Sequence, residues 1–501
     1  MLAILFKTTL FIAAYCESST DYYQKRAKIL QDETQLTFGS NTSLSVTEHN
    51  VNKCLMLHKI RELNYDFDNP QYFNFSHHYF TYKDKMKQST VYKIIKDMPK
   101  GAALHIHDMA LLGPDYLLNI TYMDYLYVCF ENAGIKFQFS NNKPNISCED
   151  KWQMMSTVRN ASSNVIEFDK EIRKHFTMVV KDPDVVYSDI NVTWKTFMNY
   201  FITVEQLLAY RPVWEQYFYD ALKKFREDKI MYIEIRSVLP RLYELDGTVY
   251  DQLVTAKAYR KVIHRFVKDF PDFIGAKLIF APPRHVSRSI VDSYIEMAKK
   301  IKNDMADIFA GFDLVGQEDL GSPLIEFASQ FLKIENETNF FFHAGETDWY
   351  GTKTDDNLID AILLGTKRIG HAYALPKHPV LMRMVVENDI GLEVNVISNT
   401  ILSLVRDVRN HPLSLFFANN LPVIVSSDDP GAWEAEPISD DFYVAFFGAS
   451  SRFSDLRMLK QLAINSLKYS ALNDTKKSEA LNIFYRTWNQ YISNFNCTLY
   501  V

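Results

Sequence analysis

The chain has 501 residues, of which 47% are apolar and 14% are aromatic. This composition excludes an intrinsically disordered chain, and the length allows two or three domains. The net charge of -6 and the pI near 6.1, with no dense run of Lys or Arg, argue against a nucleic-acid partner and favour a small molecule.

The first sixteen residues have the pattern of a secretory signal peptide. Residues 1–16 carry a short apolar stretch that is interrupted by Lys7 and ends in small residues. The stretch is too short for a membrane span, and no later run reaches about 18 apolar residues. We therefore expect a secreted, extracellular protein with no membrane span; retention of the segment as an anchor is the less favoured alternative.

Cysteines and sequons support an extracellular location. Removal of the signal peptide leaves Cys54, Cys129, Cys148 and Cys497, which allow three pairings. We expect a disulfide between Cys129 and Cys148, which flank a compact polar segment, and leave the other two open. Asn-x-Ser/Thr sequons start at Asn41, Asn74, Asn119, Asn145, Asn160, Asn191, Asn336, Asn473 and Asn496. Together with the signal peptide, these features predict a disulfide-bonded glycoprotein.

Residues 17–98 predict a helical region that precedes the first strand. An aromatic cluster lies in its second half, formed by Tyr65, Phe67, Tyr72, Phe73, Phe75, Tyr79, Phe80 and Tyr82. An apolar surface of this kind is usually covered by a partner, and a two-fold dimer is the commonest solution. We therefore expect this region to be a dimerisation arm of a homodimer.

The rest of the chain alternates apolar strand-like runs with amphipathic stretches. The expected strands are GAALHIH near residue 101 and, from residue 228 onward, KIMYIEIR, FIGAKLIFA, DIFAGFDLVG, NFFFHAGE, RIGHAYA, IGLEVNVISN and LPVIVSSDD. Eight parallel strands with intervening helices make an α/β fold of the (β/α)8 TIM-barrel type, whose active site lies where the strands end. We assign residues 99–118 and 184–501 to this catalytic barrel. Residues 119–183, with the expected disulfide, form an insertion after the first strand.

Metal-binding residue types follow four of these strands. His105 and His107 alternate on one strand, so both side chains point to the same face. His343 adds a third nitrogen and Asp428 a carboxylate oxygen. Three His and one Asp suit Zn2+, one ion per chain, with a water completing a catalytic site. The sequence predicts a mononuclear metallohydrolase.

Three further residues are suited to proton transfer beside such an ion. A metal-activated water needs a base and an acid, and His371 and Glu346 lie at strand ends where they can take these two roles. Asp429 follows Asp428 directly, and consecutive strand residues face opposite ways. Both carboxylates reach one site only if the chain turns there, and Pro430-Gly431 supplies a turn signal.

The chain resembles the secreted adenosine deaminase-related growth factors, a family that includes the extracellular type of adenosine deaminase. The resemblance rests on the segments MPKGAALHIHD, GFDLVGQED, FFHAGETDW, RIGHAYAL, LEVNVISN and VSSDDPG, and it covers nearly the whole chain. It implies a zinc-dependent enzyme that converts adenosine and 2'-deoxyadenosine to inosine and deoxyinosine with release of ammonia. It also implies that the insertion binds a cell-surface receptor or a glycosaminoglycan.

Carried over by position, the resemblance implies roles for ten residues. Zinc is bound by His105, His107, His343 and Asp428. Glu346 donates a proton to purine N1, and His371 is the base and orients the water on the metal. Asp429 contacts N7, the backbone of Gly316 lies near N3, Asp108 near the ribose, and Trp194 forms an aromatic wall.

Two departures from the family pattern affect residues other than the metal ligands. Asn395-Val396 replaces a Cys-Pro pair, and Pro283 stands where some relatives have His. Both bear on substrate affinity rather than on the reaction. Two alternatives stay open: an amidohydrolase for another aminopurine or a nucleotide, and a growth-factor-like protein whose barrel only binds adenosine or a receptor.

Overall fold

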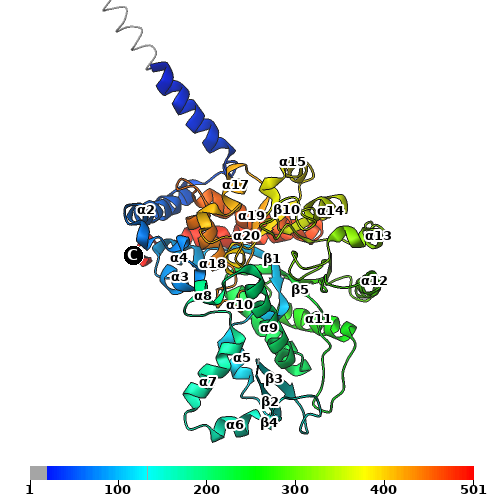
Figure 1. The fold of residues 1–501 in the computed structure, drawn as a ribbon. Coiled ribbons are helices and arrows are strands. Elements are labelled where there is room, and N and C mark those ends of the chain that lie inside the picture. The colour runs from blue at the N-terminus through cyan, green and yellow to red at the C-terminus, as the bar shows by residue number, and fades with distance from the viewer. Residues whose placement is uncertain (1–19, 133, 501) are drawn as a thin grey trace, which may run out of the picture.

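The computed structural model describes residues 20–132 and 134–500. The signal peptide predicted for residues 1–16 lies outside the described residues. Within them, no helix is both long and apolar enough to cross a membrane. Parallel strands lie at the centre, and helices surround them (Figure 1).

Each of the eight predicted segments contains a parallel strand. The first sheet has the order β1-β5-β6-β7, with strands Gly101–His107, Ile230–Ser237, Gly275–Phe280 and Phe309–Phe312. The second has the order β11-β10-β9-β8, with strands Val423–Val425, Gly391–Val394, Arg368–His371 and His343–Ala344. The strands are almost wholly buried, as expected for parallel sheets covered by helices.

Single bridges join the two sheets at both of their edges. Ile106 of β1 pairs with Asp428 beyond β11, and Phe312 of β7 pairs with Phe340 ahead of β8. The eight strands therefore do not form the one continuous ladder expected from the sequence, since β8 and β11 are too short to extend it. The α/β class and the parallel strands agree with the prediction.

Helices connect the strands and cover them. They are α9 (Ile190–Leu208), α10 (Arg211–Glu227), α11 (Gln252–Asp269), α12 (Arg288–Asp304), α13 (Ala328–Phe331), α14 (Asn357–Leu363), α15 (Pro379–Glu387), α16 (Val396–Ile401), α17 (Leu413–Ala418), α18 (Ser439–Tyr443), α19 (Leu456–Lys468) and α20 (Asp474–Asn494). A capping side chain starts several of them. Asp189, for example, accepts hydrogen bonds from the backbone N–H groups of Asn191 and Val192 in the first turn of α9.

The region before β1 is helical, as predicted. It contains α2 (Val46–Asp68), α3 (Tyr79–Met86) and α4 (Thr90–Asp97). Ser45 and Glu48 form a capping box that fixes the start of α2. A further helical stretch, residues 20–36, is almost entirely exposed and extends away from the rest of the structure (Figure 1).

Most of the aromatic cluster is covered by the chain itself and not by a partner subunit, contrary to the expectation from the sequence. Five of its residues are buried within the chain, namely Phe73, Phe75, Tyr79, Phe80 and Tyr82. Phe75 packs on Tyr443 and Phe447, and Tyr79 donates a hydrogen bond to Asp440, so the cluster packs on the chain's own C-terminal half. Tyr65, Phe67 and Tyr72 remain exposed.

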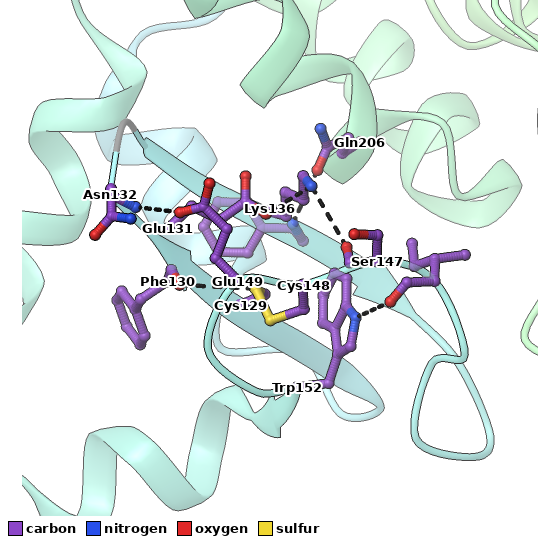
Figure 2. Close-up of a disulfide and its surroundings, with 12 residues drawn as sticks. Cys129, Phe130, Glu131, Asn132, Lys136, Ser147, Cys148, Glu149, Trp152 and Gln206 are labelled. Atoms are coloured by element: carbon purple, nitrogen blue, oxygen red, sulfur yellow. Dashed lines mark hydrogen bonds and ion pairs between the residues drawn. A yellow bond between two sulfur atoms is a disulfide. The ribbon is translucent and has the colours of Figure 1, made fainter.

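The insertion forms a small unit of its own at one end of the molecule (Figure 1). Helix α5 (Pro114–Ile120) leads into it, and α8 (Pro183–Val186) begins at its last residue. Its own elements are β2 (Leu126–Glu131), β3 (Gly134–Phe139), β4 (Gln153–Met154), α6 (Met155–Ala161) and α7 (Val165–Arg173). The three strands form an antiparallel sheet. Figure 2 shows the disulfide between Cys129 and Cys148, as predicted.

The pairing that the sequence left open is also defined. Cys54 of α2 is bonded to Cys497, 443 residues later in the chain. This disulfide fastens the N-terminal helices to the C-terminal end of the chain.

Candidate active site

The ends of the parallel strands bring together the predicted metal ligands. The ligand atoms of His105, His343, His371 and Asp428 all lie within 4.8 Å of one another. His107 belongs to a second, overlapping group with Asp428 and Asp429. The four predicted ligands therefore meet in one place, and His371, predicted as a base, lies among them.

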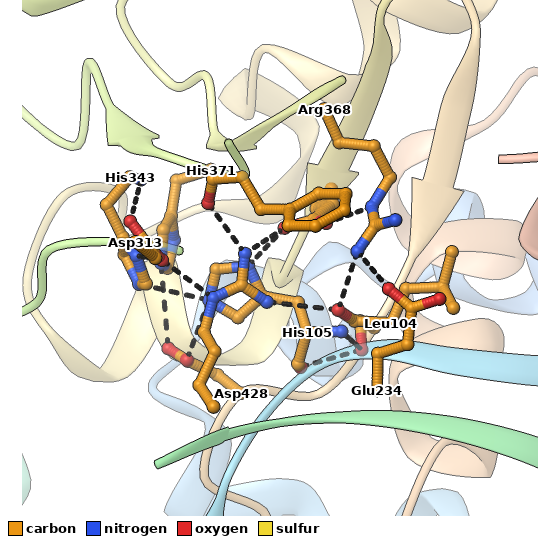
Figure 3. A network of polar contacts seen from close by, with 12 residues as sticks. Leu104, His105, Glu234, Asp313, His343, Arg368, His371 and Asp428 are labelled. Carbon is orange, nitrogen blue, oxygen red and sulfur yellow. Dashed lines mark hydrogen bonds and ion pairs between the residues drawn. The ribbon is translucent and has the colours of Figure 1, made fainter. Parts of the chain in front are cut away.

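Several atoms suited to bind a cation lie close to one another. Nε2 of His105 and Nε2 of His343 are 3.1 Å apart. Oδ1 of Asp428 lies 3.3 Å from Nε2 of His105 and 3.0 Å from Nε2 of His107. Figure 3 shows His105, His343, His371 and Asp428 converging.

Two carboxylates that the sequence analysis did not assign hold two of the histidine rings. Oε2 of Glu393 lies 2.7 Å from Nδ1 of His105, and Oδ2 of Asp313 lies 2.6 Å from Nδ1 of His343. Arg236 donates to both carboxylates, at 2.7 Å and 2.8 Å. All five side chains are buried. A charged residue within an otherwise apolar strand, as at Glu393, or directly after one, as at Asp313, is the signal that could have identified them.

This arrangement fits a divalent metal. Each carboxylate accepts the Nδ1 hydrogen, so in the neutral rings Nε2 of both His105 and His343 carries a lone pair. Two lone pairs that face each other at 3.1 Å repel, and a cation beside them removes the repulsion. Burial lowers the pKa of His343 to about 3, which keeps its ring neutral. Neutral imidazole is the form that binds zinc.

The carboxylate of Asp428 is also in the form that binds metals. Burial alone would raise its pKa, but the contacts with His105 and His107 and the nearby His371 hold that pKa well below its usual range. Asp428 is therefore ionised at neutral pH. Its Oδ2 accepts a hydrogen bond from Ser398 at 2.7 Å, which leaves Oδ1 facing the histidines.

The backbone takes up unusual conformations to aim these side chains. His371 and Asp428 have φ angles of 61° and 59°, in the left-handed region that non-glycine residues rarely occupy. The left-handed backbone conformation of Asp428 turns the chain, so that the side chains of both Asp428 and Asp429 reach the same cavity. At Gly370 a Cβ would lie 2.9 Å from the His105 ring, so the close approach of β9 requires glycine.

A cavity beside the histidines contains all the residues predicted to bind substrate. Its lining includes Asp108, Trp194, Gly316 and Asp429, together with Glu346 and the histidines 107, 343 and 371. Trp194 comes from α9, which also supplies apolar side chains to the same wall. Pro283, at one of the two departures from the family pattern, lines the cavity as well.

The surroundings of Glu346 favour its protonated form, which is that of a proton donor. Burial, followed by the negative charges of Asp428 and Glu318, raises its pKa well above the usual value. Glu318 also fixes the turn on which Glu346 lies, because its two oxygens accept hydrogen bonds from the backbone N–H groups of Gly345 and Glu346 at 3.2 and 3.0 Å. The sequence analysis did not assign Glu318.

Two further acids in the cavity are shifted in the same direction. Burial raises the pKa of Asp108 to about 7, against the opposing hydrogen bonds from Ser237 and Tyr259. Burial, and after it the charge of Asp428, raises the pKa of Asp429 well above the usual value. Side chains with such pKa values in a cleft are typical of an active site.

Comparison with known proteins identifies the family. The profile described as "Adenosine deaminase" matches residues 176–486, and the one described as "Adenosine/AMP deaminase N-terminal" matches residues 3–95. The chain belongs to the adenosine deaminase family. An adenosine deaminase of Aedes albopictus is 41% identical, over 94% of this chain and 88% of that protein. Human adenosine deaminase 2 is 37% identical, over 98% of this chain and 97% of that protein.

Solved structures of other deaminases share the fold of this family member. An adenine deaminase from Arthrobacter aurescens superimposes with a TM-score of 0.56 at 19% identity, covering 78% of this chain and 99% of that one. An N6-mAMP deaminase from Arabidopsis gives a TM-score of 0.56 at 15% identity, with 79% and 99% covered.

Proposed function

We propose that this protein is a zinc-dependent hydrolase that converts adenosine and 2'-deoxyadenosine to inosine and deoxyinosine with release of ammonia. The observation that carries the proposal is the presence of Glu346 in one cavity with the converging histidines and Asp428. Similarity to adenosine deaminases over more than nine-tenths of the chain supports the same reaction.

His105, His107, His343 and Asp428 would hold the zinc ion, since they supply three imidazoles and one carboxylate. When bound, the ion lowers the pKa of a water molecule to about 7 and so provides a nucleophile at neutral pH. Glu393 and Asp313 orient two of these rings through their Nδ1 atoms. His371 lies beside the ligands, where it orients the water or accepts its proton.

The remaining roles concern the purine. Water adds to C6, the bond from C6 to the amino nitrogen breaks, and the amino group leaves as ammonia, so the reaction involves no oxidation. Glu346, whose raised pKa favours the protonated carboxyl, donates its proton to N1. Asp429 contacts N7, and the backbone of Gly316 lies near N3. Asp108 binds the ribose, and Trp194 forms the wall of the base pocket.

The fold proposed for this reaction is a (β/α)8 barrel in which single bridges replace two of the strand ladders. Residues 99–118 and 184–501 form the barrel, 17–98 the N-terminal dimerisation region and 119–183 the insertion. We propose that the insertion binds a cell-surface receptor or a glycosaminoglycan. The exposed helical stretch 20–36 and the exposed Tyr65, Phe67 and Tyr72 would contribute to a homodimer.

We further propose that the protein is secreted and glycosylated. The apolar segment 1–16, the sequons and the two disulfides support this location. A binding protein without catalysis is the alternative. It is disfavoured because a protein that only binds adenosine has no need for a buried carboxyl of raised pKa, that of Glu346, beside four metal-type ligands.

One assay tests the enzymatic proposal. Purified protein is incubated with adenosine, and the loss of adenosine absorbance is followed while the zinc content of the same sample is measured. We expect deamination with about one zinc per chain and loss of activity on chelation. Full activity in metal-free protein would contradict the role of zinc, and adenosine binding without turnover would favour the binding protein.

A further inference from the structure

We propose that Asn399, held in place by His411, fixes the tautomer of His371, so that His371 presents a hydrogen rather than a lone pair to the active site. Asn399 and His411 are positioning residues, since neither lines the cavity with the ligands. The inference rests on the proposed function only in the role that it gives to His371.

The series of hydrogen bonds starts at a backbone N–H, a group that can only be the donor. The backbone N–H of Leu413 donates to Nδ1 of His411, with 2.9 Å between the two nitrogens. Because a backbone N–H can only donate, Nδ1 of His411 must carry a lone pair. His411 is buried, and burial lowers its pKa to about 3, so the ring is neutral. Its one hydrogen is therefore on Nε2.

This hydrogen determines the orientation of the next side chain. Nε2 of His411 lies 2.9 Å from Oδ1 of Asn399 and donates to it. The opposite orientation of the amide would place its NH2 group against the Nε2 hydrogen of His411, so it is excluded. Asn399 is fully buried on α16, and water cannot compensate for a wrong orientation.

The amide in turn determines the hydrogen position on His371. Nδ2 of Asn399 lies 3.1 Å from Nδ1 of His371 and, as an NH2 group, must donate to it. Nδ1 of His371 therefore carries the lone pair, and the hydrogen of the neutral ring is on Nε2. That Nε2 atom lies 3.8 Å from Oδ2 of Asp428, on the side of the metal-type ligands.

The consequence concerns the two roles considered for His371. A ring that presents Nε2–H donates a hydrogen bond to an oxygen atom in the site. Its other nitrogen, Nδ1, faces Nδ2 of Asn399 at 3.1 Å and Oε1 of Glu346 at 3.4 Å, and a protonated Glu346 carboxyl can also only donate to it. His371 is thus prepared to orient the nucleophilic water. It cannot accept a proton at Nε2 unless the contact with Asn399 is first broken.

The first test reads the tautomer directly. Protein purified with its metal and labelled with ¹⁵N in histidine is studied by long-range ¹H–¹⁵N correlation, and the His371 signals are assigned by their absence in H371Q. We expect the Nδ1 shift of a nitrogen with a lone pair and the Nε2 shift of a nitrogen with a hydrogen. The opposite pattern would overturn the proposal.

A matched substitution tests the cause. In N399D the carboxylate accepts from both rings, so the hydrogen of His371 should move to Nδ1, and turnover should fall by about 10² to 10⁴-fold with the metal retained. N303D makes the same chemical change at an exposed position of α12 and should alter neither the tautomer of His371 nor the turnover of adenosine. A His371 tautomer unchanged in N399D would overturn the proposal.

The tautomer of His371 and the deamination of adenosine are measured independently, so failure of this inference can be distinguished from failure of the proposed function. If N399D does not fold, the spectrum of the native protein still decides the tautomer. The expected tautomer in a protein that does not deaminate adenosine would leave the inference standing and reject the proposed function. The opposite tautomer in an enzyme that deaminates adenosine would reject the inference and leave the proposed function standing.

Discussion

Oδ2 of Asp313 lies 2.6 Å from Nδ1 of His343 and 2.8 Å from Nε of Arg236. One carboxylate thus fixes a metal-type histidine and is itself neutralised by an arginine. The same arginine reaches Glu393, which fixes His105. Two rings from different sheets are therefore held by one buried set of charges (Figure 3).

This relationship predicts a loss of metal affinity in D313N. Asparagine keeps the size of the side chain but removes the charge that pairs with Arg236 and orients His343. We expect the zinc affinity to fall by about 10 to 100-fold, as measured by competition with a chelator. D307N, in which the aspartate is an exposed partner of Arg260, is the matched control. Equal affinities of D313N and the native protein would refute the orienting role.

A second prediction concerns the proton donor. The raised pKa of Glu346 favours the protonated carboxyl, which can release a proton, whereas the amide of E346Q retains the shape but cannot. We expect turnover of adenosine to fall by at least about 10²-fold while the zinc content stays unchanged. E335Q, at an exposed position, should behave like the native protein. Near-normal turnover of E346Q would remove Glu346 from the mechanism.

The charge of the cavity predicts a preference for nucleosides over nucleotides. Five carboxyl groups line the cavity, from Asp108, Glu205, Glu346, Asp428 and Asp429. Arg236 is the one Lys or Arg among its described lining residues, and it is already paired with Asp313 and Glu393. A phosphate would enter without a free cation to bind it. We expect kcat/KM for AMP to be at least about 10²-fold below that for adenosine, a discrimination of about 3 kcal/mol.

The acid on α9 offers a way to test this explanation. Glu205 lies on the apolar wall of the cavity, and E205Q removes one negative charge there. We expect E205Q to narrow the difference between AMP and adenosine. Comparable kcat/KM values for the two substrates in the native enzyme would show that charge does not select the substrate.

The last prediction concerns the proposed dimer. Five aromatic residues of the N-terminal region are part of the chain's own core, so deletion of all of residues 17–98 would expose that core. Deletion of residues 20–36 removes only the exposed helical stretch. We expect the full protein to sediment as a dimer and the shorter one as a folded monomer. A full-length protein that is monomeric at micromolar concentration would contradict the dimer.

Local sequence patterns were sufficient for the strands and for the residues that follow them. Apolar runs such as KIMYIEIR predict buried strands, because side-chain periodicity depends only on neighbours in the chain. His105, His343, His371 and Asp428 could be assigned because each lies at or just beyond the end of such a run. The sequence also predicted the disulfide between Cys129 and Cys148, which are near each other in the chain.

Only the tertiary structure decided which partners these residues have. Glu393 contacts a histidine 288 positions away, and Cys54 pairs with a cysteine 443 positions away. The packing of Phe75 on Tyr443 depends likewise on which surfaces meet, and so does the contact between Asn399 and His371. A hydrogen bond or a packed ring is defined by distance and direction in space, and the sequence pattern around a single residue carries neither. The sequence by itself therefore determined the strands and the residues at their ends, whereas the fold determined how those residues are oriented and charged.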